Sequence, residues 1–386
     1  MSTELPDQGF VFWPVGNGDS TTIVVDNSTI IQVDLHHTEK SDDENEDAVH
    51  IVDELVEKLP QKNGKPFLSV FALTHPDKDH IQGFEELLEE VTIGEIWHTP
   101  RVFLEFHKDL CEDAKAFKKE VERRKEIAIK DPDSIESGDR VRVFGHDDIF
   151  KEADYEDFPE DYKSYPGTTL TLIDGRDYSD VFKAFIHAPF KDGNEGERNE
   201  TSLAIQVSLS KGSSLGKLLL FGDLSYPTLR RIYDKTQEKE NDEFLEWDVL
   251  LSPHHCSKKA MYWKGEEDDQ ENLKTDIMDD FEGSALDEAY IIASSESSFT
   301  NGKGDNPPHQ KARNEYEKIV AAGRFICTHE YESSDNIKPV VFELSDEGLV
   351  LISGDIESQN SASKLSSAIA AARGNTETPT KEQGFG

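Results

Sequence analysis

Apolar residues in the first hundred positions form several short β-type runs and one helical run. Residues 10–13, 21–25 and 29–33 are apolar or β-branched, and turn-forming residues separate them, which predicts three strands. Apolar side chains then recur at helical spacing, which predicts one amphipathic helix before Pro60: Val49, Val52, Leu55, Val56 and Leu59. Residues 67–73 are apolar except for Ser69, a pattern typical of a strand buried on both faces.

The later part of the chain has a second β-rich pattern with its own helices. Strands are expected, among others, at 169–173, 181–187, 203–208, 217–221 and 247–251. Helices are expected at 224–239 and 308–322. Two β-rich halves with intervening helices predict an α+β fold, in which two packed β-sheets are flanked by helices as a four-layer αβ/βα sandwich.

Two segments do not follow this pattern. Residues 105–130 are charged with helical spacing and 131–165 are acidic and irregular, so we expect 105–165 to be a charged insertion or lid. Residues 355–386 are rich in Ser, Ala and Thr, with too few large apolar side chains to pack. The sequence therefore predicts one catalytic domain over 1–354 and a disordered tail over 355–386.

Composition sets the electrostatics of this domain. Of 386 residues, 35% are hydrophobic and 31% are charged, and the formal net charge is −39. A field of that sign repels nucleic acid, because phosphate binding relies on Lys and Arg. Bound divalent cations can reverse the sign locally, so a polynucleotide substrate is disfavoured rather than excluded. An acid-rich surface can equally reflect a saline habitat.

Cysteine content and the N-terminus bear on the cellular location. The three cysteines have no CxxC spacing, which argues against a disulfide framework and against a thiolate zinc site. The first residues have neither the basic nor the apolar region of a signal peptide. No apolar run approaches the roughly 18–20 residues that span a bilayer. We therefore expect a cytoplasmic protein without a membrane partner.

Histidine and aspartate gather directly after the buried strand at 67–73. The cluster comprises His75, Asp77, Asp79 and His80. Imidazole and carboxylate ligands suit zinc, manganese or iron. Taken alone, the cluster could also be a polar loop that caps the following helix. Further His and Asp side chains, however, follow other predicted strands, and the combined pattern indicates a metal site: Asp34, Asp223, His254 and His255.

Five segments of the chain resemble motifs of the metallo-β-lactamase superfamily. They read VGNGDS at 15–20, IQVD at 31–34, THPDKDH at 74–80, FGD at 221–223 and SPHHCS at 252–257. Within that superfamily they are most similar to the soluble hydrolase domain of ComEC, the competence DNA-uptake protein. The likeness runs in order from about residue 9 to 353 and leaves out 105–165. It is specific for the superfamily and much less so for the substrate.

The resemblance implies a site with two metal ions, zinc first, with manganese or iron as alternatives. By motif, His75 and Asp77 hold one ion, and Asp79 and His80 hold the other. Asp223 bridges them, and one of His254 and His255 completes the second site. Asp77 stands where the best-known branch has His, which makes the ligand set harder and raises the chance of manganese or iron.

Other positions match the family less securely. His187 fits the third superfamily motif as a metal ligand, or is an ordinary histidine at the end of a strand. Asn199 and Ser202 resemble the family's NNxS element, which implies that they shape the pocket rather than bind metal. His309 is either near the substrate or a surface residue at a helix start. Cys256 replaces a family Gly, and we expect it either to crowd the cleft or to have a less unusual backbone angle.

The implied activity is that of a dinuclear metal-dependent hydrolase, most simply a phosphodiesterase or nuclease. Two ions can share a hydroxide that attacks a phosphodiester, with Asp34 or Asp79 orienting ligands or acting as base. His309, or the unligated member of the histidine pair, would protonate the leaving oxygen. The expected partner is a phosphoester substrate, either nucleic acid or nucleotide. Two alternatives stay open: hydrolysis of a small ester or phosphoester, and a catalytically silent scaffold that binds a protein partner through its acidic surface.

Overall fold

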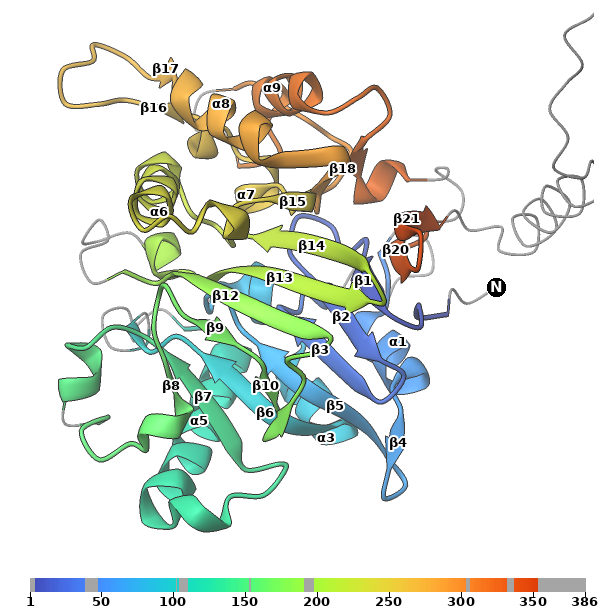
Figure 1. The fold of residues 1–386 in the computed structure, drawn as a ribbon, viewed down its shortest axis with the longest axis vertical. Helices are drawn as coiled ribbons and strands as arrows, with labels where there is room; N and C mark the ends of the chain where they lie inside the picture. The colour runs from blue at the N-terminus through green and yellow to red at the C-terminus, as the bar shows by residue number, and fades with distance from the viewer. Residues whose placement is uncertain are drawn as a thin grey trace, which may run out of the picture.

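The computed structural model describes residues 4–38, 48–101, 103, 110–152, 154–190, 198–302, 306–331 and 337–352. The tail predicted to be disordered, 355–386, lies outside the described residues. Most strands fall into two large sheets that pack face to face (Figure 1). Within the described part of the chain, no helix combines the length and the apolar character needed to cross a membrane.

The first sheet has ten strands, in the order β21-β20-β1-β2-β3-β5-β6-β7-β8, with β4 beside β5. Strands β3, β5, β6, β7 and β8 pair in parallel, whereas β21, β20, β1, β2 and β3 pair antiparallel. The bounds are β1 Gly9–Phe12, β2 Thr21–Asp26, β3 Thr29–Val33, β4 Gln61–Lys62, β5 Lys65–Ala72, β6 Thr92–His98, β7 Arg140–Phe144, β8 Lys163–Ser164, β20 Val340–Ser345 and β21 Gly348–Ile352.

The second sheet has seven strands, in the order β19-β18-β15-β14-β13-β12-β9. Strands β14, β15, β18 and β19 are parallel, and the others are antiparallel. The bounds are β9 Thr169–Leu170, β12 Phe182–Ala188, β13 Ala204–Lys211, β14 Ser214–Leu220, β15 Trp247–Leu251, β18 Ala285–Ala293 and β19 Phe325–Cys327.

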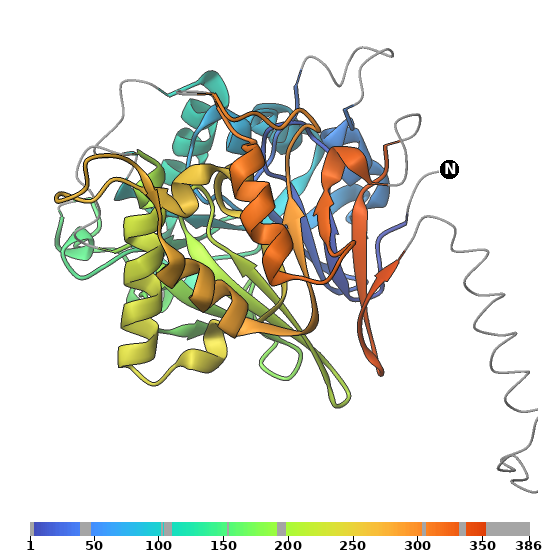
Figure 2. The ribbon, with the colours of Figure 1, turned by 90° about the horizontal axis from the view of Figure 1, so that it is seen from above.

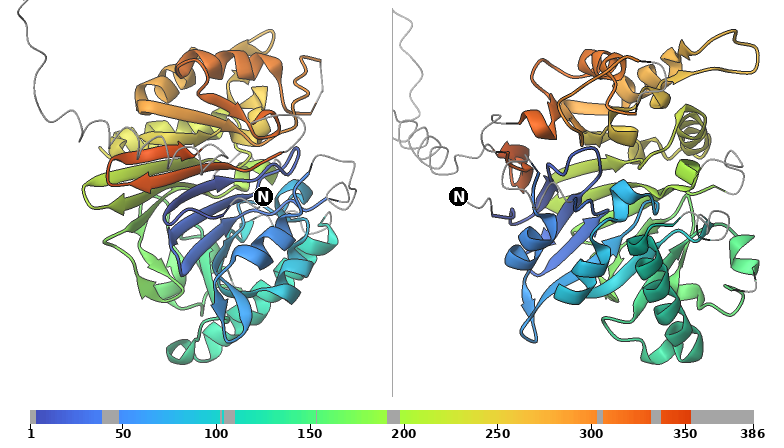
Figure 3. Two further views of the ribbon diagram at one scale, coloured as in Figure 1. Left: turned by 90° about the vertical axis from the view of Figure 1, so that its right-hand side faces the viewer. Right: turned by 180° about the vertical axis from the view of Figure 1, so that it is seen from behind.

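Helices cover the outer faces of both sheets (Figures 2 and 3). On the first sheet these are α1 Ile51–Lys58, α3 Phe84–Glu90 and α5 Glu112–Lys130. On the second they are α6 Tyr226–Glu238, α8 Thr275–Ser284 and α9 Gln310–Ile319. Three apolar cores fill the spaces between the layers, one beneath each set of helices and one between the sheets. The predicted α+β fold of two packed sheets flanked by helices is confirmed.

The prediction that 105–165 is an insertion or lid is wrong for much of that segment. Helix α5 packs on the first sheet, and β7 pairs in parallel with β6 inside it. Charge hid this strand in the sequence, because Arg142 lies in the middle of β7. Its guanidinium is buried beside Glu95 of β6, with Nε 3.1 Å from the carboxylate. Burial is possible because each charge has its partner.

The packing of the sheets brings four strand ends to one place. Asp34 follows β3 and His75 follows β5, and these two strands run in parallel. Asp223 follows β14 and His254 follows β15, which are also parallel. Carboxyl ends of parallel strands lie at the same edge of a sheet, so each sheet presents polar groups at one edge. The face-to-face packing then brings the two edges together.

Candidate metal centre

The turn after β5 presents its histidines and aspartates through a short helix, α2 Lys78–Ile81. Backbone hydrogen bonds hold this turn in place: the amide of Asp19 donates to the carbonyl of Asp79, and that of Leu35 to the carbonyl of His80. The loops after β1 and β3 therefore fix the orientation of the turn. Because the turn bends tightly, four His and Asp side chains from six consecutive residues can reach the same cluster.

Asp223 lies at the centre of the cluster, with one carboxylate oxygen facing each of two groups. Its Oδ2 is 3.6 Å from Nε2 of His75 and 3.5 Å from Nε2 of His254. Its Oδ1 is 3.2 Å from Nε2 of His80 and 3.8 Å from Nε2 of His255. A carboxylate that presents its two oxygens to separate groups has the geometry of a bridging ligand.

Each group also contains one aspartate from the turn. Oδ2 of Asp77 lies 3.9 Å from Nε2 of His75, on the first side. Oδ2 of Asp79 lies 3.4 Å from Nε2 of His255, on the second. On that second side the ligand atoms of Asp79, His80, Asp223 and His255 all lie within 4.8 Å of one another. The structure thus separates the two histidines of the pair, placing one on each side of Asp223.

Burial and mutual charge shift the pKa values of these side chains strongly. Burial opposes ionisation of Asp223, but the surrounding histidines, first His254 and His80, bring its pKa well below the usual range. Burial lowers the pKa of His80, yet Asp223 and Asp34 together raise it well above the ordinary value. Burial and the neighbouring His80 lower the pKa of His75 to about 3. Charges are therefore concentrated in a space with little water.

The cluster has the donor chemistry and the spacing of a cation site. Nε2 of His75 and Oδ1 of Asp223 are buried and, among the described residues, make no hydrogen bond, although both face the cluster. Buried polar atoms without partners are rare in proteins and call for a ligand. Two ligands on one zinc ion, each about 2.1 Å away, lie about 3.4 Å apart at a tetrahedral angle. Neighbouring ligand atoms across the cluster are 3.2–3.9 Å apart. The residues fit divalent cations.

Three side chains form the open face of the cluster. The side chains of Asp77, Asp79 and His254 are 28%, 38% and 15% exposed, respectively. The side chains of His75, His80, Asp223 and His255 are at most 2% exposed. A substrate can therefore approach from the side of the two turn aspartates and His254.

Asp34 supports the cluster from its buried side. Its Oδ2 is 2.7 Å from Nδ1 of His80, and it also accepts the hydroxyl of Thr74, whose amide donates to Oδ1. An Nδ1–H that donates to Asp34 fixes the ring so that Nε2 of a neutral His80 would offer its electron pair to a cation shared with Asp223. Asp34 is 1% exposed and its carboxylate is fully engaged, which suits an orienting role. Its predicted role as a base stays a prediction.

We expect Asp34→Asn to lower both metal affinity and hydrolytic rate by about 10–100-fold, the usual effect of losing a carboxylate behind a metal-ligating histidine. The asparagine amide would donate toward Nδ1 of His80 and move the ring proton to Nε2. Metal titration and initial rates measure the two effects. Asp26→Asn is the control, because Asp26 also ends a strand but accepts hydrogen bonds from nearby Ser28. Equal losses in both variants would contradict the orienting role.

The second histidine turn has an unusual backbone. His254, His255 and Cys256 have φ values of 51°, 50° and 63°, in the left-handed region that non-glycine residues seldom adopt. Both expectations for Cys256 are wrong. Its backbone angle is the unusual one, and its side chain lies in the apolar core beneath α6, α8 and α9 rather than in the cleft. The strained turn directs two consecutive imidazoles to opposite sides of Asp223.

Two residues near the cluster were missed in the sequence. Oδ1 of Asp19 lies 3.2 Å from Nδ1 of His255, opposite the ring nitrogen that faces Asp79. The Nδ1–H of His36 donates to the carbonyl of Val15, the side chain lies in the field of Asp79, and burial lowers the pKa of His36 to about 4. The signal for Asp19 was its place in the VGNGDS motif, where turn chemistry alone explained it. His36 directly follows Leu35 and had no motif of its own.

Gly18 in the same motif permits the close approach of these loops. A Cβ at this position would lie 2.1 Å from Nδ1 of His36 and 2.7 Å from the carbonyl oxygen of Asp79. Both distances are far below van der Waals contact. The glycine is therefore required by the packing of the first loop against the turn after β5.

Asn199 and Ser202 lie beside the cluster, on the segment between β12 and β13. Nδ2 of Asn199 donates to Oδ2 of Asp223 at 3.3 Å, and the hydroxyl of Ser202 donates to the carbonyl of Asn199. Asn199 therefore contacts the same oxygen of Asp223 that faces His75 and His254. The resemblance suggested that the two residues shape the site, and the contacts agree with that interpretation.

The structure does not bring His187 into the cluster. Its Nε2 donates to the carbonyl of Phe244 at 2.8 Å, and its Nδ1 lies 3.3 Å from the hydroxyl of Thr236. Both ring nitrogens are therefore engaged away from the other histidines. The predicted position at the end of a strand is right, but the prediction of a metal ligand is wrong. Strand direction alone could not show which face the side chain takes.

His309 packs against the second histidine turn. It is the N-cap of α9 and 2% exposed, its amide donates to the carbonyl of Cys256, and its Nδ1 accepts the amide of Lys258. It is therefore a buried residue and not the surface residue of the alternative interpretation. Its role as a proton donor stays a prediction.

Comparison with known proteins gives structural similarity only. No protein-family model matches the chain, and no curated protein matches it. Similar solved structures include a B3 metallo-β-lactamase with an active-site glutamic acid, at 11% identity and a TM-score of 0.35, over 65% of this chain and 77% of that one. BJP-1 of Bradyrhizobium japonicum, a subclass B3 metallo-β-lactamase, has 15% identity and a TM-score of 0.30, over 65% and 78%.

The class B3 di-zinc metallo-β-lactamase LRA-12, from an Alaskan soil metagenome, is a third similar structure. It has 13% identity and a TM-score of 0.32, over 72% of this chain and 89% of that one. TM-scores in this range do not establish a shared fold.

Proposed function

We propose that the chain is a dinuclear metal-dependent hydrolase of the metallo-β-lactamase superfamily that cleaves phosphodiesters. The observation that carries this proposal is the position of Asp223. Its two oxygens face separate groups of histidine and aspartate, and the spacing of those groups suits a cation on each side. A second buried carboxylate, Asp34, orients one of the histidines.

Each cation would have its own set of ligands. His75 and Asp77 hold the first, and Asp79, His80 and His255 hold the second, with Asp223 shared. Zinc is the first expectation for ligands of imidazole and carboxylate, and the three carboxylates also suit manganese or iron. Bound cations of this kind supply Lewis acidity and acidify a water at neutral pH.

The chain's own residues would position the substrate and move the proton. His254 lies on the open face and its Nε2 is 3.5 Å from Asp223, so it is placed to carry a proton to the leaving oxygen. Asp77 and Asp79 keep the open face anionic, which excludes a second negative group unless cations are bound. His309 supports the turn that presents His254.

Two classes of substrate are proposed: a phosphodiester in nucleic acid and a small phosphoester. The five motifs resemble a DNA-uptake hydrolase, which favours a phosphodiester in nucleic acid. The net charge of −39 favours a small phosphoester, because a long polyanion would be repelled along its whole length. Nuclease activity is therefore expected to depend on ionic strength more strongly than turnover of a small diester.

Metal analysis and a substrate panel test the proposal. We expect about two metal equivalents per purified chain, and turnover of bis-p-nitrophenyl phosphate well above that of nitrocefin. Single-stranded DNA, assayed at low and high salt, distinguishes a nuclease from an enzyme of small diesters. Bound metal without turnover of any substrate would favour the silent scaffold. A chain that binds no divalent metal would overturn the proposal.

A further inference from the structure

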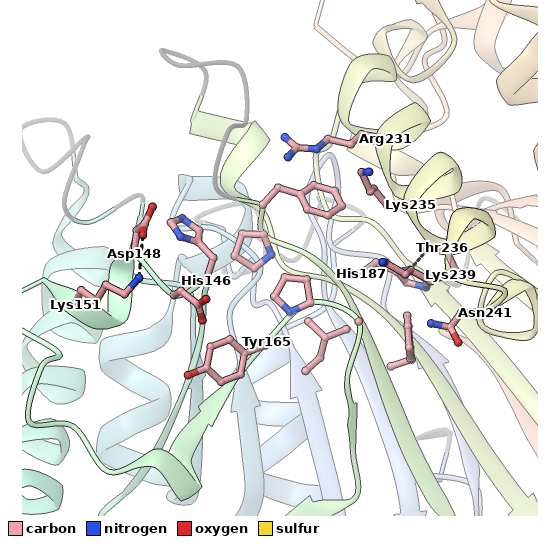
Figure 4. Close-up of a pocket in the computed structure, with 17 residues that line it drawn as sticks. His146, Asp148, Lys151, Tyr165, His187, Arg231, Lys235, Thr236, Lys239 and Asn241 are labelled. Carbon is pink, nitrogen blue, oxygen red and sulfur yellow. Dashed lines mark hydrogen bonds and ion pairs between the residues drawn. The ribbon is translucent and has the colours of Figure 1, made fainter.

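A second site on the molecule is a pocket of about 730 Å³ between α6 and the segment that precedes β9. Figure 4 shows the residues that line it, with His146, Lys151 and Tyr165 on one side and the basic residues of α6 on the other. The end of β12 forms its floor, through residues 185–187. A pocket of this size can enclose most of a small organic molecule.

The charge of this pocket is opposite to that of the protein. Two carboxylates line it, Asp147 and Asp148, against four cationic side chains: Lys151, Arg231, Lys235 and Lys239. The whole chain, in contrast, has 41 basic and 80 acidic residues. A local excess of cations within such a field attracts an anion to this point of the surface.

Three of the cations come from one face of α6 and its C-cap. Arg231, Lys235 and Lys239 are four residues apart, so they stack along the same side of the helix. The opposite side is buried in the apolar core through Leu229 and Tyr233. Packing of that apolar side fixes the rotation of α6 and directs the basic side toward the pocket.

The ion pairs of these cations are weak enough to exchange for a ligand. Lys235 lies 2.5 Å from Glu238, with side chains 54% and 57% exposed, and Lys151 lies 3.4 Å from Asp148. Exposed pairs of this kind contribute little to stability. The guanidinium carbon of Arg231 lies 4.5 Å from the centre of the Phe190 ring, which keeps the side chain beside the pocket.

The rest of the lining is apolar or offers neutral hydrogen-bonding groups. Phe185 stacks on Phe244 with ring centres 4.0 Å apart and is only 4% exposed, so the aromatic wall open to a ligand is formed by the half-buried Tyr165 and Phe190. Tyr165, Pro189 and Phe190 add further flat or apolar surface, and Asn241 offers an amide. This combination suits a flat ring together with an anionic group.

We propose that this pocket binds a phosphorylated small molecule with a ring, its phosphate held by Arg231, Lys235 and Lys239 and its ring against the aromatic wall. Arginine and lysine are the side chains that recognise phosphate, by a planar fork and by a point charge respectively. The site is separate from the cluster around Asp223 and needs no metal. The proposal therefore does not depend on the hydrolase activity.

Calorimetric titration of the full chain in excess chelator tests the proposal, because chelation keeps a phosphate probe away from any bound cation. The probes are adenosine monophosphate, adenosine and inorganic phosphate. We expect measurable binding of adenosine monophosphate, weaker binding of inorganic phosphate and none of adenosine. Binding should weaken as sodium chloride is raised.

The decisive variant is Lys235→Glu with Lys239→Glu, which should weaken binding of adenosine monophosphate about tenfold or more. Lys115→Glu with Lys119→Glu is the matched control. Those lysines are also exposed and four residues apart on a helix, and Lys115 is 54% exposed and paired with Glu112. Equal binding by both double variants, equal binding of adenosine, or no binding of adenosine monophosphate would overturn the proposal. Circular dichroism confirms that the variants are folded.

Discussion

Asp223→Asn is expected to reduce phosphodiester turnover by at least about 10³-fold and to leave at most one metal ion per chain. The asparagine has the size of aspartate but only one oxygen, so it cannot present a charged oxygen to both sides. It also removes the negative charge that, with Asp34, keeps the pKa of His80 high. Metal content by mass spectrometry and turnover of bis-p-nitrophenyl phosphate measure the two effects.

Asp248→Asn provides a matched control for this substitution. Asp248 lies on β15 of the same sheet, and its carboxylate accepts the backbone amide of Lys217. An asparagine oxygen can accept the same hydrogen bond, so metal content and turnover should stay near those of the wild type. If Asp223→Asn kept two metal ions and full turnover, the proposal that Asp223 is shared by two cations would be wrong.

Removal of metal by a chelator is expected to abolish turnover and to lower the thermal midpoint by about 5–10 °C. An ion present at a thousand times its Kd stabilises the folded chain by about 4 kcal/mol. Two ions in a chain of this length correspond to that range of temperature, because the unfolding entropy grows with size. Differential scanning calorimetry with and without chelator measures the shift.

The chelator experiment has its own internal control. Asp223→Asn should show a much smaller chelator-dependent shift than the wild type, whereas Asp248→Asn should show the full shift. Addition of zinc or manganese to the chelated wild type should restore both midpoint and turnover, and the better of the two identifies the metal. A midpoint that does not respond to chelator in the wild type would indicate that the cluster is held together by its own hydrogen bonds.

The two sites that we propose for anionic ligands obtain their positive charge in different ways. Around Asp223, the acidic side chains need bound cations before an anionic substrate can approach. In the pocket beside α6, lysine and arginine supply the positive charge directly. A small phosphorylated ligand could therefore bind to the second site under conditions in which the first is empty of metal, and the calorimetric test uses that difference.

The sequence revealed those strands whose apolar residues were continuous or alternating. The run from Phe67 to Leu73 contains most of β5, and the apolar spacing at 224–239 contains α6. The apolar pattern did not predict β7, because Arg142 interrupts it there and is neutralised by Glu95 from a neighbouring strand. A single sequence does not show that two charges far apart in the chain are buried together.

For the candidate site, local sequence was informative where ligands are close in the chain. The cluster from His75 to His80 was recognised because its residue types alternate directly after a buried strand. His187 was assigned wrongly because the end of a strand is visible in the sequence, but the side chain's neighbours, Thr236 and Phe244, are not. Asp19 was missed for the same reason, since only folding places it beside His255.

By itself, the sequence determined the residue types of the site and the strands that carry them, because both depend on local pattern and spacing. The tertiary structure alone decided that Asp223 lies between two groups and that His254 and His255 face opposite sides of it. It also decided that the basic side of α6 faces a pocket. These arrangements depend on the packing of two sheets and on backbone angles at a strained turn, which arise from contacts between residues distant in the chain.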